Sequence, residues 1–314
     1  MPRFLPNDHS IVLLDGGVGS QVFARAKTDK NNLWCSGVFY GNGKSILKEI
    51  HSDFFTAGSQ IATANTYATV KTRLEDAGMI ECPADLCAMA VETAKEARDE
   101  YGSGLLAGSL GPLFKSYSPE KDNSLPFDEQ VELYQNYMTD LKDAEVLLFE
   151  TISSIFHLKV ILEAVKQQQP SQAVWLSLSV DDKDGTRLRS GENVESVLPY
   201  LDVDYVEAIL VNCSKPEVIG DSMRILDKFG MIFGAYGNNI SNLEAFIKTA
   251  NYQYAGANND VGPVRYAEFV MEWIKMGATI VGGCCEIGPR YIAKMAENIK
   301  NEGYELAIFP VKRK

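Results

Sequence analysis

The sequence lacks any uninterrupted apolar run of about 18 residues, the length that a membrane-spanning helix needs. Its opening segment, MPRFLPNDHS, also lacks the apolar core of a secretory signal. Basic side chains are too few to balance the acidic ones, and the net charge of −12 repels nucleic-acid phosphates and anionic lipid surfaces. We therefore expect a cytoplasmic protein whose partners are small molecules rather than nucleic acid or membranes. The sequence leaves its oligomeric state, monomer or homodimer, open.

Histidine is scarce, with three residues in 314. His9, His51 and His157 fall in the N-terminal segment and in predicted helices, where we expect surface or packing roles rather than metal binding. Six cysteines in a chain of this length, without an export signal, argue against a disulfide framework and for reduced thiols.

Linkers rich in proline, glycine or serine are also missing, so nothing marks a domain boundary and we expect one domain over residues 1–314. An apolar content of 46% is sufficient for a large core. Short apolar runs alternate with stretches of helical periodicity, which is typical of parallel strands joined by helices. The runs predict strands at 11–15, 60–65, 104–109, 145–150, 173–180, 205–212, 231–235 and 278–282, and the helical periods lie at 46–57, 83–101, 127–142, 155–168, 216–229, 243–249 and 263–276.

Eight such strands favour a closed (β/α)₈ TIM barrel over a doubly wound open sheet, which gives a similar pattern. In a barrel the reactive groups come from the C-terminal ends of the strands. A long polar connection at 112–126 follows the third run, so we expect it on the same face as a loop or lid.

Polar residues end several of these runs. Asp15, followed by Gly16 and Gly17, ends the first run, and Glu150 ends the apolar fourth run. Two carboxylates on one rim can hold the ammonium of an amino-acid substrate, although a turn-forming aspartate and a solvated glutamate are the simpler alternatives. Asn65, followed by Thr66 and Tyr67, ends the second run, and Asn212 ends the sixth. The two asparagines either orient these groups or satisfy backbone, and Tyr67 and Tyr117 either line the pocket or only pack.

Three cysteines also fall at strand ends. Cys213 follows the sixth run, and Cys284 and Cys285 follow the eighth. A barrel brings these thiols to one mouth, where three sulfur ligands and an open fourth position are typical of catalytic zinc. Adjacent strand residues point to opposite faces, so both cysteines can ligate only if the backbone leaves strand geometry, which Gly282 and Gly283 permit. The alternative is that each cysteine is a small core residue.

These residues resemble, in order and over nearly the whole chain, the signature segments of the homocysteine S-methyltransferases. GGCC at 282–285 with an upstream NC is the most specific part. The segments are DGGVGS at 15–20, ANTY at 64–67, GSLGP at 108–112, FETI at 149–152, VNC at 211–213 and GGCC at 282–285.

The resemblance implies a TIM barrel with zinc held by Cys213, Cys284 and Cys285, and a substrate amine and carboxylate gripped near Asp15 and Glu150. One departure is Glu286, since the family commonly continues its two cysteines with Gly-Thr-Thr-Pro. Glu286 either contacts the substrate, the donor or a neighbouring loop, or it complements the N-terminus of the next helix. The candidate substrate-binding residues are Asp15, Gly16, Gly17, Asn65, Thr66, Tyr67, Glu150, Asn212 and Glu286, of which Asp15 and Glu150 are also the catalytic candidates.

We therefore predict zinc-dependent transfer of a methyl group from a sulfonium, S-methylmethionine or S-adenosylmethionine, to homocysteine, giving methionine. An anionic thiolate site attracts a sulfonium, and so do aromatic faces. Betaine as donor and selenocysteine or another thiol as acceptor are alternatives. So are a zinc hydrolase and a non-catalytic, thiol-binding barrel, although zinc hydrolases of this fold usually recruit histidine and structural zinc takes four protein ligands.

Overall fold

The computed structural model describes residues 10–26, 38, 42–202, 204–249 and 256–311. All eight predicted strands are present. A ninth strand, β9, is too short for periodicity to predict. The strands are β1 (Ser10–Leu13), β2 (Ile61–Ala64), β3 (Leu105–Leu110), β4 (Val146–Ile152), β5 (Ala173–Leu178), β6 (Ala208–Asn212), β7 (Ile232–Tyr236), β8 (Ile280–Val281) and β9 (Glu305–Leu306).

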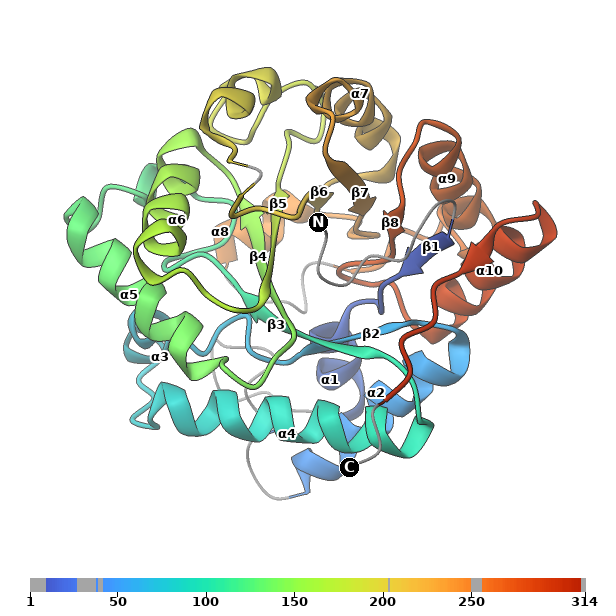
Figure 1. The fold of residues 1–314 in the computed structure, drawn as a ribbon, viewed down its shortest axis with the longest axis horizontal. Helices are drawn as coiled ribbons and strands as arrows, with labels where there is room; N and C mark the ends of the chain where they lie inside the picture. The colour runs from blue at the N-terminus through green and yellow to red at the C-terminus, as the bar shows by residue number, and fades with distance from the viewer. Residues whose placement is uncertain (1–9, 27–37, 39–41, 203, 250–255, 312–314) are drawn as a thin grey trace.

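The strands form one parallel sheet in the order β2-β3-β4-β5-β6-β7-β8-β1-β9. The curled sheet closes where β2 approaches β1. The Gln60 N–H, just before β2, donates a hydrogen bond to the Leu13 carbonyl of β1 at 2.8 Å. The Leu13 N–H donates in turn to the Gln60 side chain, also at 2.8 Å. The result is the TIM-barrel-like α/β fold that the sequence predicts, with helices outside a curled sheet (Figure 1).

Seven helices match the predicted helical periods: α2 (Gly43–Ala57), α4 (Pro83–Tyr101), α5 (Phe127–Asp140), α6 (Ile155–Gln168), α7 (Pro216–Leu226), α8 (Leu243–Thr249) and α9 (Pro263–Lys275). Pro83, Pro216 and Pro263 lie in the first turns of α4, α7 and α9, where the missing N–H of proline removes no intrahelical hydrogen bond. Gly58 ends α2 with φ 111°, a conformation that favours glycine.

The remaining helical segments are α1 (Val18–Ala26), α3 (Lys71–Asp76), α10 (Pro289–Asn301) and the 3₁₀ segments η2 (Pro119–Lys121), η3 (Val194–Tyr200) and η4 (Asp227–Phe229). The sequence prediction misses α1, α3 and α10. The helix α3 has only six residues, too few for a clear helical period. In contrast, α10 buries Ile292, Met295 and Ile299 at helical spacing, so its sequence does contain the pattern that predicts a helix.

Alternate strand residues fill two apolar layers. On β4, Leu148 belongs to a cluster inside the barrel with Leu14 and Trp175, whereas Leu147 and Phe149 pack against the outer helices. Side chains therefore fill the barrel interior, and a ligand pocket is confined to its C-terminal mouth. Among the described residues, no helix is both long and apolar enough to cross a membrane.

Candidate active site

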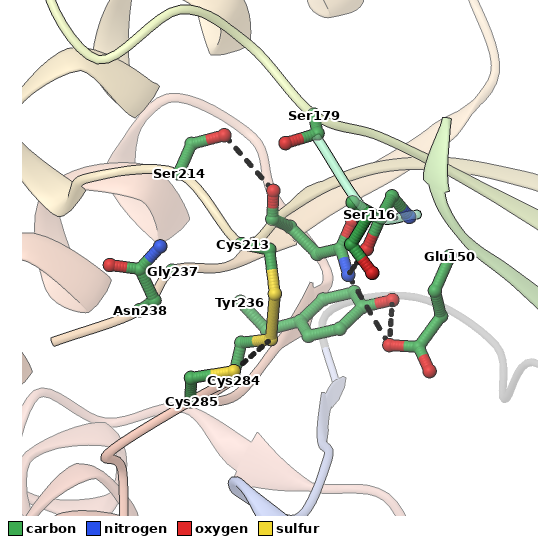
Figure 2. The surroundings of a disulfide bond; sticks show 12 residues. Ser116, Glu150, Ser179, Cys213, Ser214, Tyr236, Gly237, Asn238, Cys284 and Cys285 are labelled. Atoms are coloured by element: carbon green, nitrogen blue, oxygen red, sulfur yellow. Dashed lines mark hydrogen bonds between the residues drawn. A yellow bond between two sulfur atoms is a disulfide. The ribbon is translucent and has the colours of Figure 1, made fainter. Parts of the chain in front are cut away.

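Three cysteines converge at the barrel mouth. The sulfur atoms of Cys213, Cys284 and Cys285 all lie within 4.8 Å of one another. Cys213 follows β6, and the other two follow β8. Figure 2 shows Cys285 beside the bonded pair of Cys213 and Cys284, with its sulfur 4.0 Å from that of Cys284. The barrel thus brings together all three predicted metal ligands.

Cys213 and Cys284 form a disulfide in this structure, with their Cα atoms 5.7 Å apart. The sequence predicts reduced thiols, and for this pair that expectation is wrong here. The reason is geometric, since the closeness that lets two thiolates share one metal ion also lets them bond to each other. Of the other cysteines, Cys82 is exposed and Cys87 buried, both as free thiols, and Cys35 lies outside the described residues.

Glycines give the cysteine loop the space that it needs. A Cβ at Gly283 would lie 2.1 Å from the Ile287 side chain, and one at Gly17 would lie 2.6 Å from the Cys284 carbonyl oxygen. The loop therefore packs against the segment after β1 more closely than any side chain allows. Both cysteines lie beyond the end of β8, and their sulfurs can therefore face the same cluster.

Glu150 enters the pocket through an irregularity in β4. The register of β4 against β5 shifts between Phe149 and Ile152, and Thr151 adopts φ 61°. Such bulges redirect a side chain and are frequent beside active sites. The strand consequently presents Glu150 to the barrel mouth, where the residue is 8% exposed.

Three neutral donors hold the Glu150 carboxylate. The Ser109 hydroxyl donates to Oε2; the Tyr236 hydroxyl donates to Oε1 at 3.0 Å and the Asn212 amide to the same oxygen at 3.3 Å. Figure 2 shows the Tyr236 hydroxyl directed at this carboxylate. Burial raises the pKa of Glu150, and these hydrogen bonds oppose the rise. None of the three donors carries a positive charge, so the site can still attract a cation.

Asp15 forms a second buried carboxylate. Its Oδ2 accepts a hydrogen bond from the Thr63 N–H and its Oδ1 from the Thr63 hydroxyl, both at 2.7 Å. Burial raises the pKa of Asp15 to about 7; the Thr63 bonds oppose this rise, and the Glu150 carboxylate adds to it. The two carboxylates therefore share one electrostatic environment, in which a bound ammonium would relieve their repulsion.

Strained backbone gathers around the same site. Five described residues other than glycine have positive φ, and of these Gln169 is a helix cap. The other four are Tyr117, Thr151, Cys213 and Glu286, which flank or line this mouth. Such strain persists only where the surroundings enforce it, and it is concentrated at functional sites.

The pocket brings together most, but not all, of the predicted substrate residues. Thr66 lies behind the pocket, where its hydroxyl donates to the Ser109 carbonyl at 2.7 Å. Asn212 acts through Glu150 and the Thr151 N–H. The Glu286 N–H donates to Ser20, and its side chain is not part of the lining. The predicted residues that do line the pocket are Asp15, Gly16, Gly17, Asn65, Tyr67, Tyr117, Glu150, Cys213, Cys284 and Cys285.

The lining also includes residues that the sequence did not assign to the pocket, among them Thr63, Ser109, Ser116, Tyr236 and Phe246. Tyr236 is the last residue of β7, one position beyond the predicted end, so a longer strand would have placed it on the rim. Ser109 belongs to the GSLGP segment at 108–112, but nothing in the sequence indicates that its hydroxyl donates to Glu150.

A family model described as homocysteine S-methyltransferase matches residues 12–299 of the chain. The chain belongs to the homocysteine S-methyltransferase family. Among relatives, it is 26% identical to the homocysteine S-methyltransferase of Escherichia coli strain K12, over 93% of this chain and 96% of that protein. It is 25% identical to the homocysteine S-methyltransferase YbgG of Bacillus subtilis strain 168, over 92% and 94% of the two chains.

Solved structures support the fold assignment for this family member. The metallated form of the Escherichia coli homocysteine methyltransferase MmuM matches with a TM-score of 0.75 and 23% identity, over 93% of this chain and 97% of that one. The oxidised form of the same protein matches with a TM-score of 0.74. At this identity the match shows that the two chains share a fold.

Proposed function

We propose that this homocysteine S-methyltransferase family member transfers a methyl group from a sulfonium donor to the sulfur of homocysteine, giving methionine, with zinc as its cofactor. The observation that carries the proposal is the pairing of a three-cysteine cluster with two buried carboxylates in one pocket. The cysteines suit a sulfur-binding metal, and the carboxylates suit the ammonium of an amino acid.

The donor set fits zinc. A tetrahedral zinc–thiolate site with bonds of about 2.3 Å separates its sulfurs by roughly 3.8 Å, and the three sulfurs here lie within 4.8 Å. Cys213, Cys284 and Cys285 would hold the ion once the disulfide between the first two is reduced. When bound, zinc supplies the Lewis acidity that keeps a substrate thiol deprotonated near neutral pH.

The carboxylates orient the acceptor. Glu150, fixed by its three neutral donors, and Asp15, fixed by Thr63, would both face the homocysteine ammonium. Binding of the ammonium favours ionisation of Asp15, whose pKa of about 7 otherwise leaves it partly protonated at neutral pH. The amino-acid end is thereby anchored on one side of the pocket and the thiol is directed to the cysteines on the other.

The rest of the lining suits a cationic donor. Tyr67, Tyr117 and Phe246 present aromatic surface to the pocket, and Tyr117 and Phe246 pack in one cluster with the three cysteines. No histidine is among the lining residues that the structure describes. Aromatic faces attract sulfonium and quaternary ammonium groups. We therefore place S-methylmethionine or S-adenosylmethionine first and betaine second, and the lack of histidine favours methyl transfer over zinc hydrolysis.

Zinc binding requires all three cysteines to be reduced, so we also propose a reducing compartment such as the cytoplasm as the place of action. We propose further that residues 1–314 act as one homocysteine-binding domain.

The test uses the full chain, reduced and loaded with zinc. It is incubated with homocysteine and, in separate reactions, S-methylmethionine, S-adenosylmethionine, betaine and methyl-tetrahydrofolate, and methionine is followed by mass. We expect turnover with a sulfonium, about one zinc per chain, and loss of both in Cys213→Ser, Cys284→Ser and Cys285→Ser. Cys82→Ser is the matched control, because that thiol is free and exposed. Zinc retained by all three single variants would refute the metal assignment.

A further inference from the structure

Arg189 contacts the backbone of Cys213 from another part of the barrel. It lies between β5 and η3, in a segment anchored by a backbone bridge between Val180 and Leu188. Its Nη2 donates to the carbonyl oxygen of Cys213 at 2.9 Å, and its Nε donates to the Ser179 hydroxyl at 2.7 Å. The Asp182 carboxylate accepts from Nη2 at 3.1 Å. The side chain is only 9% exposed, so this contact belongs to the interior of the mouth.

The carbonyl that Arg189 holds belongs to a strained residue. Cys213 has φ 48°, in the left-handed region that cysteine rarely adopts. Its own N–H has only a long contact of 3.4 Å to the Tyr236 carbonyl. The hydrogen bond from Arg189 is therefore the better-formed of these two backbone interactions, and it fixes the direction of the peptide that carries the ligand.

The same guanidinium also contacts the aromatic wall. Its central carbon lies 4.8 Å from the centroid of the Tyr117 ring, and Tyr117 makes an edge contact with Phe246 at 6.3 Å. Both rings line the pocket together with Cys213. One side chain thus joins the cysteine from β6 to the connection after β3, which are far apart in sequence.

We propose that Arg189 is a positioning residue that holds Cys213 in its ligating conformation and fixes the adjacent wall at Tyr117. The inference rests on the proposed zinc function. Only a planar guanidinium can serve Ser179, Asp182, Cys213 and a ring face at once, whereas a lysine ammonium donates from one point. A mere ion pair with Asp182 would need none of the other three contacts.

The experiment compares Arg189→Met and Arg189→Lys with two matched controls. Arg224→Met removes an exposed arginine that pairs only locally, with Asp221 at 2.6 Å. Arg73→Met removes an arginine that stacks on the other pocket tyrosine, Tyr67, at 5.0 Å. Zinc affinity is measured on reduced, full-length protein by competition with a chromogenic chelator. The absorption spectrum of the cobalt-substituted protein reports the ligand geometry directly.

We expect Arg189→Met to weaken zinc binding by roughly 10- to 100-fold, the usual effect of losing a group that orients a metal ligand. Its cobalt spectrum should shift, Arg189→Lys should fall between it and the parent, and both controls should match the parent. Thermal unfolding of the metal-free proteins identifies any variant that has lost its fold, in which case Arg189→Lys decides.

Three outcomes would overturn the inference. If the parent binds zinc through its cysteines and Arg189→Met binds within twofold of it with the same cobalt spectrum, the inference alone fails. The same holds if Arg73→Met weakens zinc equally, since stacking and not the Cys213 carbonyl would then explain the loss. A parent that takes up no zinc when reduced would refute the proposed function and the inference together.

Discussion

At the scale of single residues, the pocket depends on buried carboxylates that have no cationic partner among the residues that the structure describes. Glu150 receives three hydrogen bonds, all from neutral groups. A buried carboxylate held in this way keeps its negative charge available to a ligand, at the expense of a raised pKa. The arrangement therefore predicts how each carboxylate responds to removal of its charge.

Replacing Glu150 by glutamine should weaken homocysteine use and leave zinc in place. A charge-assisted hydrogen bond is worth roughly 1.5 to 3 kcal/mol, so kcat/KM for homocysteine should fall by about 10- to 150-fold. The hydroxyls of Ser109 and Tyr236 can rotate to meet an amide, so the fold should tolerate the change. The measurement is kcat/KM together with zinc content for parent and variant.

A thiol without an amino group, 4-mercaptobutyrate, is the matched substrate for this prediction. It should be a poor acceptor for the parent. Its kcat/KM should fall little further in Glu150→Gln, because this thiol has no ammonium for Glu150 to bind. Equal losses for both thiols would show that Glu150 does not contact the ammonium. Loss of zinc would assign Glu150 to the metal site instead.

Asp15 makes a prediction about pH and stability. Its folded pKa of about 7 lies above its ordinary value of 3.8, so the folded protein binds the proton more tightly than the unfolded chain. Stability from this group is then present below about pH 4 and is lost as the pH rises toward 7. Asp15→Asn removes this titration. The free energy of unfolding of the variant, relative to that of the parent, should therefore rise by on the order of 2 kcal/mol between pH 5 and pH 8.

Urea unfolding of the reduced, metal-free proteins at the two pH values measures this difference. The comparison of parent with variant cancels the titrating groups that do not interact with Asp15, whereas the coupling between Asp15 and Glu150 is part of the measured difference. A difference that stays constant between pH 5 and pH 8 would mean that burial does not perturb Asp15 as described.

Much of this site could be predicted from the sequence because its charged and sulfur-bearing residues stand at strand ends. Asp15, Glu150 and Cys213 each follow an apolar run, and barrel topology alone brings such ends together. The supporting contacts could not be predicted. Thr63 and Ser109 resemble any strand residue until the register is known, and the disulfide of Cys213 depends on a spacing that periodicity does not give.

At the scale of elements, the ends of β1 and β8 form one packed unit. Gly17, directly before α1, lies so close to the Cys284 carbonyl that the start of α1 and the cysteine loop cannot move independently. A pattern of apolar residues locates strands but not such contacts between loops. This is also why the eight strands were predictable while α1, which begins in the glycine-rich segment, was not.

Gly17→Ala should therefore weaken zinc binding more than it weakens the fold. The added Cβ would lie 2.6 Å from the Cys284 carbonyl oxygen and 2.9 Å from the Ser20 hydroxyl, so the cysteine loop must move. Overpacking of this kind costs about 1 to 3 kcal/mol, which corresponds to a loss of zinc affinity of up to about 100-fold.

The matched control is Gly262→Ala, before α9, where a Cβ would meet nothing within 4 Å. Zinc affinity is measured by chelator competition, and the fold by thermal unfolding without metal. If both alanine variants bind zinc like the parent, the loop is not held by Gly17.

At the scale of the whole molecule, the site lies on top of a core that is built mainly from other residues. The three clustered cysteines follow β6 and β8, whereas Trp175, Leu148 and their neighbours fill the barrel below them. This arrangement can be predicted from the sequence, because its apolar runs predict the strands of the barrel and the polar residues at the strand ends predict the lining of the mouth. A barrel with its own core needs no metal to fold, in contrast to a zinc finger.

Removing zinc should consequently lower the melting temperature without unfolding the protein. A metal that binds only the folded state stabilises it by about 2.7 kcal/mol when its free concentration is 100 times its Kd. For a domain of this size that corresponds to a shift of several degrees, and zinc bound by cysteines of the unfolded chain reduces it further. Far-UV circular dichroism of the reduced protein at 25 °C should be unchanged by a mild chelator, while thermal scans should show the lower midpoint. In Cys213→Ser the chelator should shift nothing, because the bound ion is already absent. Loss of helical signal in the parent at 25 °C would instead show that the three cysteines and their ion hold the barrel together, and the core inside β1 to β8 would not be sufficient for the fold.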